Sequence, residues 1–238
     1  MPRTMVEYAT DQITIYRFCP YQCRYCWAWR NKLFASRIQR GRYDPLEEAR
    51  KYVRIKDPRI IVVSFTSDPY PPVEKKNRLT RRVLEVLSEA KQHRSLVLTK
   101  NPILALRDFT IMKKHGDVWL GTTLISVDKT ELEPKAPKPS DRRLALYLAK
   151  KRGVKTWLSI EPIIPQITDL VEIIERTLDY VDYYVLGSFN YTKILGFEIT
   201  EDEKKAWYQK QVPKAISLLK SYGKRFFIKK ELRRYLEL

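Results

Sequence analysis

Residues 13–27, ITIYRFCPYQCRYCW, join a short apolar run to all three cysteines of the 238-residue chain. The run is rich in β-branched and aromatic residues, which is typical of a buried strand. Cys19, Cys23 and Cys26 follow at once with the spacing C-x-x-x-C-x-x-C. We therefore expect a strand over 13–18 that leads into a loop where three soft thiolates can bind one metal centre or cluster.

Five further runs of this kind recur along the chain, and helical patterns separate them. The expected strands are 60–65, 95–100, 117–124, 155–163 and 182–188. The expected helices are 44–53, 80–92, 101–116, 140–153 and 169–181, with Asp44 as an N-cap and Gly116 as a C-cap. This alternation predicts an α/β fold with a parallel sheet, either a partly closed barrel or an open doubly wound sheet. In both folds the functional loops follow the carboxyl ends of the strands.

The C-terminal part of the chain predicts a long helix, a strand-like RFFI at 225–228 and a short helix. The Pro-rich segment 133–140 is interpreted as a loop after the fourth strand. No repeat, low-complexity tract or evident linker divides the sequence. We expect one domain over 1–238, with a core at about 10–190 and an extension at about 191–238.

The chain is strongly basic, with 46 Lys and Arg against 28 Asp and Glu and a net charge of +18. Such a surface attracts polyanions, nucleic acid first among them, although Lys and Glu enrichment is also typical of thermophilic proteins. The charge is uneven. Segment 30–59 carries ten basic and four acidic residues, and the tail 224–238 is basic too. This clustering favours a polyanion partner.

Location and redox state follow from what the sequence lacks. It has no run of 18 apolar residues and no apolar leader at its start, so we expect no membrane partner and a cytoplasmic location. Thiols stay reduced there, and an odd cysteine count does not suit a disulfide framework.

Three cysteines leave the question of a fourth ligand. A structural zinc site needs four protein ligands, and the histidines on offer are His93 and His115. Both are interpreted as solvated residues at the polar ends of predicted helices. Three thiolates and a vacancy instead favour a 4Fe–4S cluster with one open iron. A zinc or structural-cluster protein without catalytic activity stays open as an alternative.

The motif formed by Cys19, Cys23, Tyr25 and Cys26 after the first strand resembles the signature of radical SAM enzymes. The resemblance implies a partial (β/α)6 TIM-type barrel, a 4Fe–4S cluster and S-adenosylmethionine (SAM) chelated at the open iron. It also implies a one-electron reductant such as a ferredoxin or flavodoxin, whose electron releases a 5′-deoxyadenosyl radical that abstracts hydrogen from a substrate.

Four longer stretches are similar to the spore photoproduct lyase-like branch of that superfamily. They are FTSDPYPPVEKKNRLTRRVLEVL (65–87), LTKNPILALRD (98–108), LEPKAPKPSDRRL (132–144) and LSIEPIIP (158–165). The chain lacks the Gly-Gly-Glu-like segment that ends the second strand of most radical SAM enzymes. In its place the resemblance points to Ser64, Thr66, Ser67 and Asp68, with Asp68 accepting a hydrogen bond from the SAM ammonium; turn formation is the alternative.

The same resemblance assigns further SAM-binding candidates at later strand ends. Lys100 is expected to reach the SAM carboxylate, unless it is one more surface lysine. Thr122 and Ser159 are expected to line the site, and Arg143 is a carboxylate clamp or a helix-surface residue. Glu161 needs a partner if it is buried, and would hold the ribose or touch substrate. Tyr25 is placed beside the adenine, whereas Trp27 and Trp29 are site or core residues.

In spore photoproduct lyase a cysteine outside the cluster returns a hydrogen, and this chain has none to spare. The return step would need another donor, such as one of its 15 tyrosines. The sequence thus supports a radical SAM enzyme that acts on a nucleic-acid base, with a peptide or small metabolite as the alternative substrate.

Overall fold

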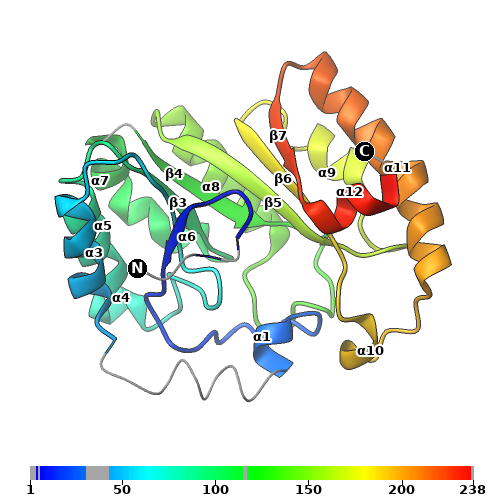
Figure 1. Cartoon of the computed structure of the whole chain (residues 1–238), viewed down its shortest axis with the longest axis horizontal. Coiled ribbons are helices and arrows are strands. Elements are labelled where there is room, and N and C mark those ends of the chain that lie inside the picture. Colours follow the sequence, from blue (N-terminus) through cyan, green and yellow to red (C-terminus); the bar gives the residue numbers. More distant parts are fainter. Residues whose placement is uncertain (1–3, 5, 31–42, 115–116, 237–238) are drawn as a thin grey trace.

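The computed structural model describes residue 4 and residues 6–30, 43–114 and 117–236, and within them seven strands form one parallel sheet (Figure 1). The strands are β1 (Asp11–Ile13), β2 (Ile60–Val63), β3 (Arg94–Leu98), β4 (Val118–Thr123), β5 (Lys155–Ile163), β6 (Tyr183–Ser188) and β7 (Arg225–Ile228). Each strand pairs with the next one along the chain. A doubly wound sheet would reverse its strand order at a switch point. The unbroken order therefore makes the fold a half-barrel, as the resemblance implied.

The first strand is shorter and earlier than predicted, at 11–13 instead of 13–18. Ser64 is the cause, because it leaves the extended conformation at a φ of 60° just after β2. Its N–H donates to the Ile13 carbonyl over 2.7 Å, and its hydroxyl accepts from the Ile15 N–H over 3.0 Å. The Ser64 side chain thus replaces the next rung of the β1–β2 ladder. The other predicted strands are correct to within two residues.

Helices follow the strands and cover one face of the sheet (Figure 1). They are α1 (Trp27–Arg30), α3 (Pro45–Arg54), α4 (Glu74–Asn77), α5 (Leu79–Leu87), α6 (Pro102–Ala105), the 3-10 turn η1 (Leu106–Asp108), α7 (Phe109–Lys114), α8 (Pro139–Lys151), α9 (Leu170–Glu175), α10 (Thr192–Leu195), α11 (Glu201–Ser221) and α12 (Lys230–Leu236). The predicted N-cap of α3 is confirmed, since the Asp44 carboxylate accepts from the Leu46 N–H over 2.8 Å.

The predicted helix 101–116 is divided into α6, η1 and α7. The turn η1 ends at the buried Asp108, whose carboxylate accepts hydrogen bonds from Tyr70 and Arg81. The predicted C-cap Gly116 lies outside the described residues. None of the described helices is long and apolar enough to cross a membrane.

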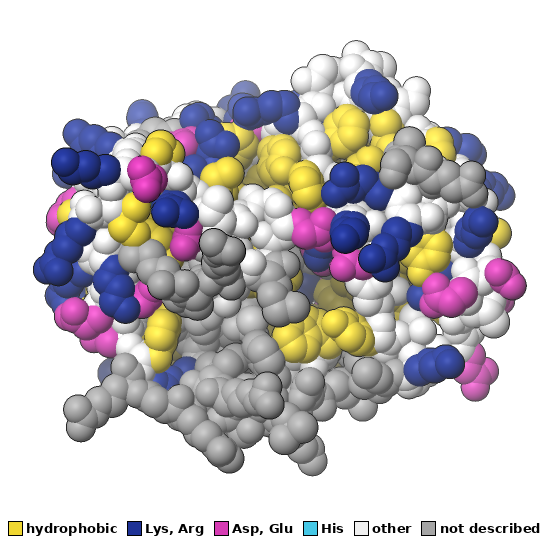
Figure 2. Space-filling view, viewed as in Figure 1, with side chains coloured by type: hydrophobic (Ala, Val, Ile, Leu, Met, Phe, Trp, Pro, Cys, Tyr) yellow, Lys and Arg dark blue, Asp and Glu magenta, His cyan; other side chains and the backbone are white. Residues whose placement is uncertain are grey.

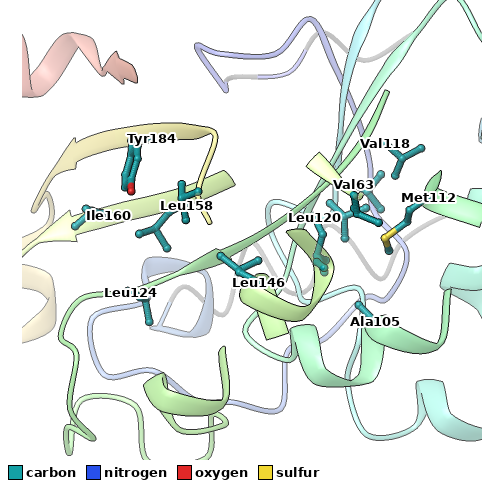
Figure 3. Packing of buried hydrophobic residues seen from close by; sticks show 14 of the residues in the cluster. Val63, Ala105, Met112, Val118, Leu120, Leu124, Leu146, Leu158, Ile160 and Tyr184 are labelled. Atoms are coloured by element: carbon teal, nitrogen blue, oxygen red, sulfur yellow. The ribbon is translucent and has the colours of Figure 1, made fainter. Parts of the chain in front are cut away.

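The larger core lies between the sheet and the helices (Figure 3). Alternate strand residues such as Leu120, Leu158 and Tyr184 face Leu146 and other helix residues there. Fully burying one such side chain contributes roughly 1.5–3 kcal/mol. This layer explains the continuous apolar runs of the sequence, because the opposite face of the sheet is buried as well.

A second core fills the concave face of the half-barrel with Val6, Tyr8, Val62, Leu96, Trp119, Trp157 and Val185. Tyr8 packs edge-on against Trp157, with 5.7 Å between ring centroids, so the N-terminal segment closes this face. Gly121 leaves the room that the indole of Trp157 needs, since a Cβ on Gly121 would lie 2.3 Å from it. The interior is therefore packed around Trp157 rather than hollow.

The predicted C-terminal long helix, strand and short helix are confirmed as α11, β7 and α12, and the strand adds a seventh member to the sheet. A capping box begins α11, because Thr200 and Glu203 exchange side-chain and backbone hydrogen bonds. The Lys230 N–H at the start of α12 donates to the Glu7 carboxylate over 2.8 Å. The N-terminal segment thus touches both β1 and the last helix.

Candidate active site

The cysteine loop, residues 19–26, crosses the carboxyl ends of the strands. All three thiols are free, and the Cys26 N–H donates to the Cys23 carbonyl over 3.0 Å in a tight turn. The loop packs against an apolar wall made of Ile125, Ile164 and Phe189. These three residues lie just beyond the carboxyl ends of β4, β5 and β6. The thiols therefore lie at the end of the sheet where the sequence predicted the site.

The donor set suits an iron–sulfur cluster better than a single metal ion. Among the described residues, no three His, Cys, Asp or Glu side chains form a group that could hold one metal ion. A cluster places its thiolates on different irons, so they need not meet at one point. Burial raises the pKa of Cys19 to about 12 and also raises that of Cys23. Burial therefore favours the protonated form of the Cys19 and Cys23 thiols, and binding of metal by these two residues would release protons.

His93 is not a ligand, and its interpretation as a solvated residue was wrong. Its ring is buried, Nδ1 accepts from the Arg59 N–H over 3.1 Å, and Nε2 lies 2.9 Å from the Tyr52 carbonyl. His93 directly precedes β3, at the end of the sheet opposite the cysteine loop. His115 lies outside the described residues.

A buried charge cluster lies beside the cysteine loop, and we call its four members, Tyr25, Lys100, Glu133 and Arg142, the Glu133 network. The Lys100 ammonium donates to the Glu133 carboxylate and to the Tyr25 hydroxyl, both over 2.7 Å. Arg142 donates to the other Glu133 oxygen over 2.5 Å, and Tyr25 donates to the first. The ammonium also lies 5.3 Å from the Tyr25 ring centroid.

The Glu133 network combines two basic side chains with one acidic side chain, so its formal charge is one net positive charge. Burial alone would raise the pKa of Glu133, but Lys100 and Arg142 outweigh it and lower that pKa to about 2. Arg142 is also held by the Thr123 and Pro137 carbonyls, over 3.0 and 2.9 Å. The Glu133 carboxylate thus keeps its charge between two basic side chains in a buried site.

The loop after β4 fastens the cysteine loop to this network. The Arg24 N–H donates to the Leu132 carbonyl over 2.8 Å, one residue before Glu133. Leu132 and Ala136 pack against the apolar wall and the cysteines. The segment 132–136 therefore covers one side of the thiols. The sequence had predicted only that this segment belongs to a Pro-rich loop.

Asp68 is buried and ties the ends of β2 and β3 together. Its carboxylate accepts hydrogen bonds from the Thr99 hydroxyl and the Lys100 N–H, each over 2.7 Å, and from the Tyr70 N–H over 2.8 Å. Burial raises the pKa of Asp68 and these bonds oppose the rise. Its charge also acts on the Cys19 thiol. Asp68 thus lies beside the cysteine loop, but its hydrogen bonds within the chain hold it in a turn.

Three neighbours of Asp68 differ in their surroundings. Ser64 terminates the β1–β2 ladder, as described above, so its hydroxyl is engaged. The Thr66 hydroxyl lies 3.4 Å from that of Thr14. The Ser67 Oγ is buried and has no hydrogen-bond partner among the described residues. Ser67 is therefore the member of this segment with an unused polar atom at the strand end.

Strand alternation separates Thr122 from Ser159. Thr122 shares the helix-facing side of β4 with Leu120, is fully buried, and donates to the Thr99 carbonyl over 2.6 Å. The structure thus turns it away from the concave face. Ser159 shares the concave side of β5 with Trp157 and is buried near the site end of the strand.

Arg143 is not brought to the cysteine loop. It lies in α8 and acts on Tyr180, in the turn that leads to the amino end of β6. Its neighbour Arg142 points into the site and holds Glu133. The two adjacent arginines lie on different faces of one helix, and Arg142 rather than the predicted Arg143 lies beside the cysteine loop.

Glu161 is partly buried, and it forms an ion pair. The Lys229 ammonium, just after β7, donates to its carboxylate over 2.5 Å and lies 5.9 Å from the Phe65 ring centroid. A Cβ on Gly187 would lie 2.8 Å from the Glu161 side chain, so this glycine leaves room for it. The pair lies at the carboxyl ends of β5 and β7, and Lys229 connects it to Phe65, which follows β2.

Sequence reasoning missed Glu133, Arg142 and Lys229. A signal for Glu133 and Arg142 was present, because both lie in the stretch LEPKAPKPSDRRL that carried the family resemblance. Lys229 had no comparable signal, since its partner Glu161 lies 68 residues earlier. On the other rim, Trp27 in α1 lies 6.3 Å from Tyr191 between ring centroids, whereas the Trp29 side chain lies outside the described residues.

Comparison with solved structures supports the fold. SuiB of Streptococcus suis bound to its precursor peptide SuiA matches with a TM-score of 0.68 and 11% identity, over 95% of this chain and 50% of SuiB. A spore photoproduct lyase variant with bound AdoMet and dinucleoside spore photoproduct matches with a TM-score of 0.67 and 13% identity, over 95% of this chain and 78% of the lyase. The chain thus spans about half the length of SuiB.

Sequence comparison identifies the family. Uncharacterized protein MJ0683 of Methanocaldococcus jannaschii is 30% identical over 197 residues, which are 79% of this chain and 73% of that protein. The family model described as "Radical SAM superfamily" matches residues 13–181, and these contain the cysteine loop and the strands β2 to β5. The cofactors of that superfamily are a 4Fe–4S cluster and SAM. The chain belongs to the radical SAM superfamily.

Proposed function

We propose that this protein is a radical SAM enzyme in which Cys19, Cys23 and Cys26 hold a 4Fe–4S cluster. The observation that carries the proposal is the set of three free thiols on one loop, at the carboxyl ends of parallel strands, with no fourth ligand among the described residues. With both cofactors bound and a ferredoxin or flavodoxin as electron source, the cluster and SAM would supply the reductive cleavage to methionine and a 5′-deoxyadenosyl radical that abstracts hydrogen from a substrate.

The chain's own side chains orient SAM and exclude water. Lys100 offers an ammonium beside the cysteine loop, where it would pair with the SAM carboxylate. Ser67 offers an unused hydroxyl at the end of β2. The apolar wall of Ile125, Ile164 and Phe189 keeps water from the reacting atoms. Glu161 and Lys229 lie farther along the strand ends, where a substrate would meet them.

A nucleic-acid base is the substrate class that the surface favours. The net charge of +18 attracts phosphates, and Lys and Arg side chains are spread over the face in Figure 2. Phe18, directly before Cys19, and Tyr191, beside Trp27, are more than half exposed at the rim of the cysteine loop. Exposed aromatic rings among cations are suited to stack on unpaired bases.

A peptide substrate is the second candidate, and the observation that favours it is the likeness to SuiB bound to its precursor peptide. Figure 2 also shows acidic side chains among the basic ones, rather than one continuous basic stripe. In either case, hydrogen return by a cysteine outside the cysteine loop is excluded, because the chain has only the three thiols.

The test is anaerobic reconstitution with iron and sulfide, followed by reduction in the presence of SAM. We expect near-visible cluster absorption and release of 5′-deoxyadenosine and methionine. The Cys23→Ala variant should lose both signals, with Arg24→Ala as the matched exposed control. A wild-type protein that binds a cluster but never cleaves SAM would contradict the proposal.

The substrate is tested separately by gel shift of single-stranded RNA and DNA at moderate salt. The comparison protein is an unrelated one of similar charge, because charge alone gives non-specific binding. Binding above that protein, weakened in Tyr191→Ala, would support a nucleic acid. Equal binding would favour the peptide class.

A further inference from the structure

The Glu133 network connects the cysteine loop to residues that lie outside this loop in the chain. Tyr25 lies between Cys23 and Cys26 in the chain, and its buried hydroxyl donates to Glu133. The backbone of Arg24 is bonded to Leu132 on the neighbouring side. One carboxylate therefore holds a residue of the metal-binding loop from 108 positions away.

The network also fixes charges beside the thiols. Glu133 and Arg142 are almost fully buried, and Lys100 is 14% exposed, so water screens these charges weakly. Lys100 and Glu133 act on the Cys23 thiol with opposite signs, and the Arg142 guanidinium acts on it too. The sum of two cations and one anion is a fixed positive charge next to a metal-binding thiol.

We propose that Glu133 and Arg142 are positioning residues that set the net charge beside Cys23 and thereby the reduction potential of the cluster. The inference rests on the proposed function, since it requires that the cysteine loop holds the cluster. When a carrier of the ferredoxin or flavodoxin class reduces the bound cluster, the carrier loses one electron and one negative charge is added beside Cys23. A positive surrounding favours that added charge, and a neutral one does not.

Two substitutions shift the charge in opposite directions. Glu133→Gln removes the anion and leaves two cations, so the reduction potential should rise. Arg142→Gln leaves Lys100 and Glu133 to cancel, so the potential should fall. We expect each shift to be on the order of tenfold in the reduction equilibrium, which is about 59 mV for one electron.

Two further variants separate charge from geometry. The double variant Glu133→Gln/Arg142→Gln has the net charge of the wild type and should return close to its potential. Arg142→Lys keeps the charge but loses the fork that holds Glu133, Thr123 and Pro137, so its potential should also stay near the wild-type value. Glu131→Gln, an exposed neighbour on the same loop, is the matched control and should shift nothing.

The measurement is a redox titration of the reconstituted protein without SAM, followed by the EPR signal of the reduced cluster, with circular dichroism to verify folding. Opposite shifts that cancel in the double variant support the proposal. The proposal is overturned, in favour of structural loosening, if both single variants shift the reduction potential in the same direction. It is also overturned if the double variant shifts the potential as far as the single variant with the larger shift. If Arg142→Gln does not fold, a rise in Glu133→Gln with none in Arg142→Lys decides the matter. Failure of the wild type to assemble a cluster would overturn the proposed function instead.

Discussion

The two ends of the sheet carry the same arrangement of charges in different surroundings. At the carboxyl ends, Glu133 lies between Lys100 and Arg142, and Lys100 also faces the Tyr25 ring. At the amino ends, Asp117 lies between Arg94 and Lys155, over 3.1 and 3.2 Å, and both cations face the Trp119 ring.

Burial is what distinguishes the two. The Glu133 side chain is 3% exposed, whereas that of Asp117 is 30% exposed and that of Lys155 is 49% exposed. Water and salt screen the Asp117 group, so its ion pairs contribute little. The Glu133 group is shielded, so each of its charges depends on the others. The buried charge group therefore lies at the end of the sheet that holds the cysteine loop, and the exposed group lies at the opposite end.

The largest expected difference concerns stability. Glu133→Ala leaves Lys100 and Arg142 as uncompensated cations and should lower the free energy of unfolding by about 3–5 kcal/mol. Asp117→Ala should lower it by about 1 kcal/mol or less, because its partners stay hydrated. Urea unfolding of the apo protein, followed by circular dichroism, measures both. Equal losses would show that burial is not what separates the two ends.

A second expected difference concerns the binding of SAM. Lys100→Ala should weaken SAM binding roughly tenfold or more, since a charge-assisted contact contributes about 1.5–3 kcal/mol. Cluster absorption should remain, because Lys100 is not a ligand. Lys155→Ala is the matched control at the amino end and should leave the affinity unchanged. Anaerobic titration calorimetry of the reconstituted protein gives both affinities; an unaltered value in Lys100→Ala would remove this lysine from the site.

The smallest expected difference is in the response to acid. The pKa of Glu133 is lowered to about 2 in the fold, below the ordinary value of 4.5, so the folded state favours its ionised form. Its contribution to stability is therefore complete above about pH 4.5 and is lost as the pH falls toward 2. The stability gap between wild type and Glu133→Gln should narrow over this window. The pKa of Asp117 is lowered too, and the stability gap between wild type and Asp117→Asn should narrow by less over the same pH range. A larger narrowing for Asp117→Asn than for Glu133→Gln would contradict this prediction.

Several features were predictable because they depend on residues close together in the chain. The spacing of Cys19, Cys23 and Cys26 places three thiols on one loop whatever the rest of the chain does. The Asp44 N-cap and the strand over 155–163 follow from local chemistry and apolar runs, and both are confirmed. Uninterrupted βα alternation with a family resemblance indicated the half-barrel.

Other features were missed because they depend on side-chain direction. Arg142 and Arg143 are neighbours, and only the packing of α8 decides which one enters the site. Thr122 and Ser159 are both polar residues near strand ends, yet they fall on opposite faces of the sheet. His93 follows a polar run that predicted exposure, but two backbone groups bind its ring in the interior.

The sequence by itself determined the cysteine loop, the order of the βα units and the end of the sheet where the candidate site lies. Each of these rests on spacing and periodicity that span only a few residues. Tertiary structure alone decided that Glu133 holds Tyr25 across 108 residues and that Lys229 meets Glu161 across 68. Partners so far apart are chosen by which buried charge would otherwise stay uncompensated, and that choice exists only once the chain has folded.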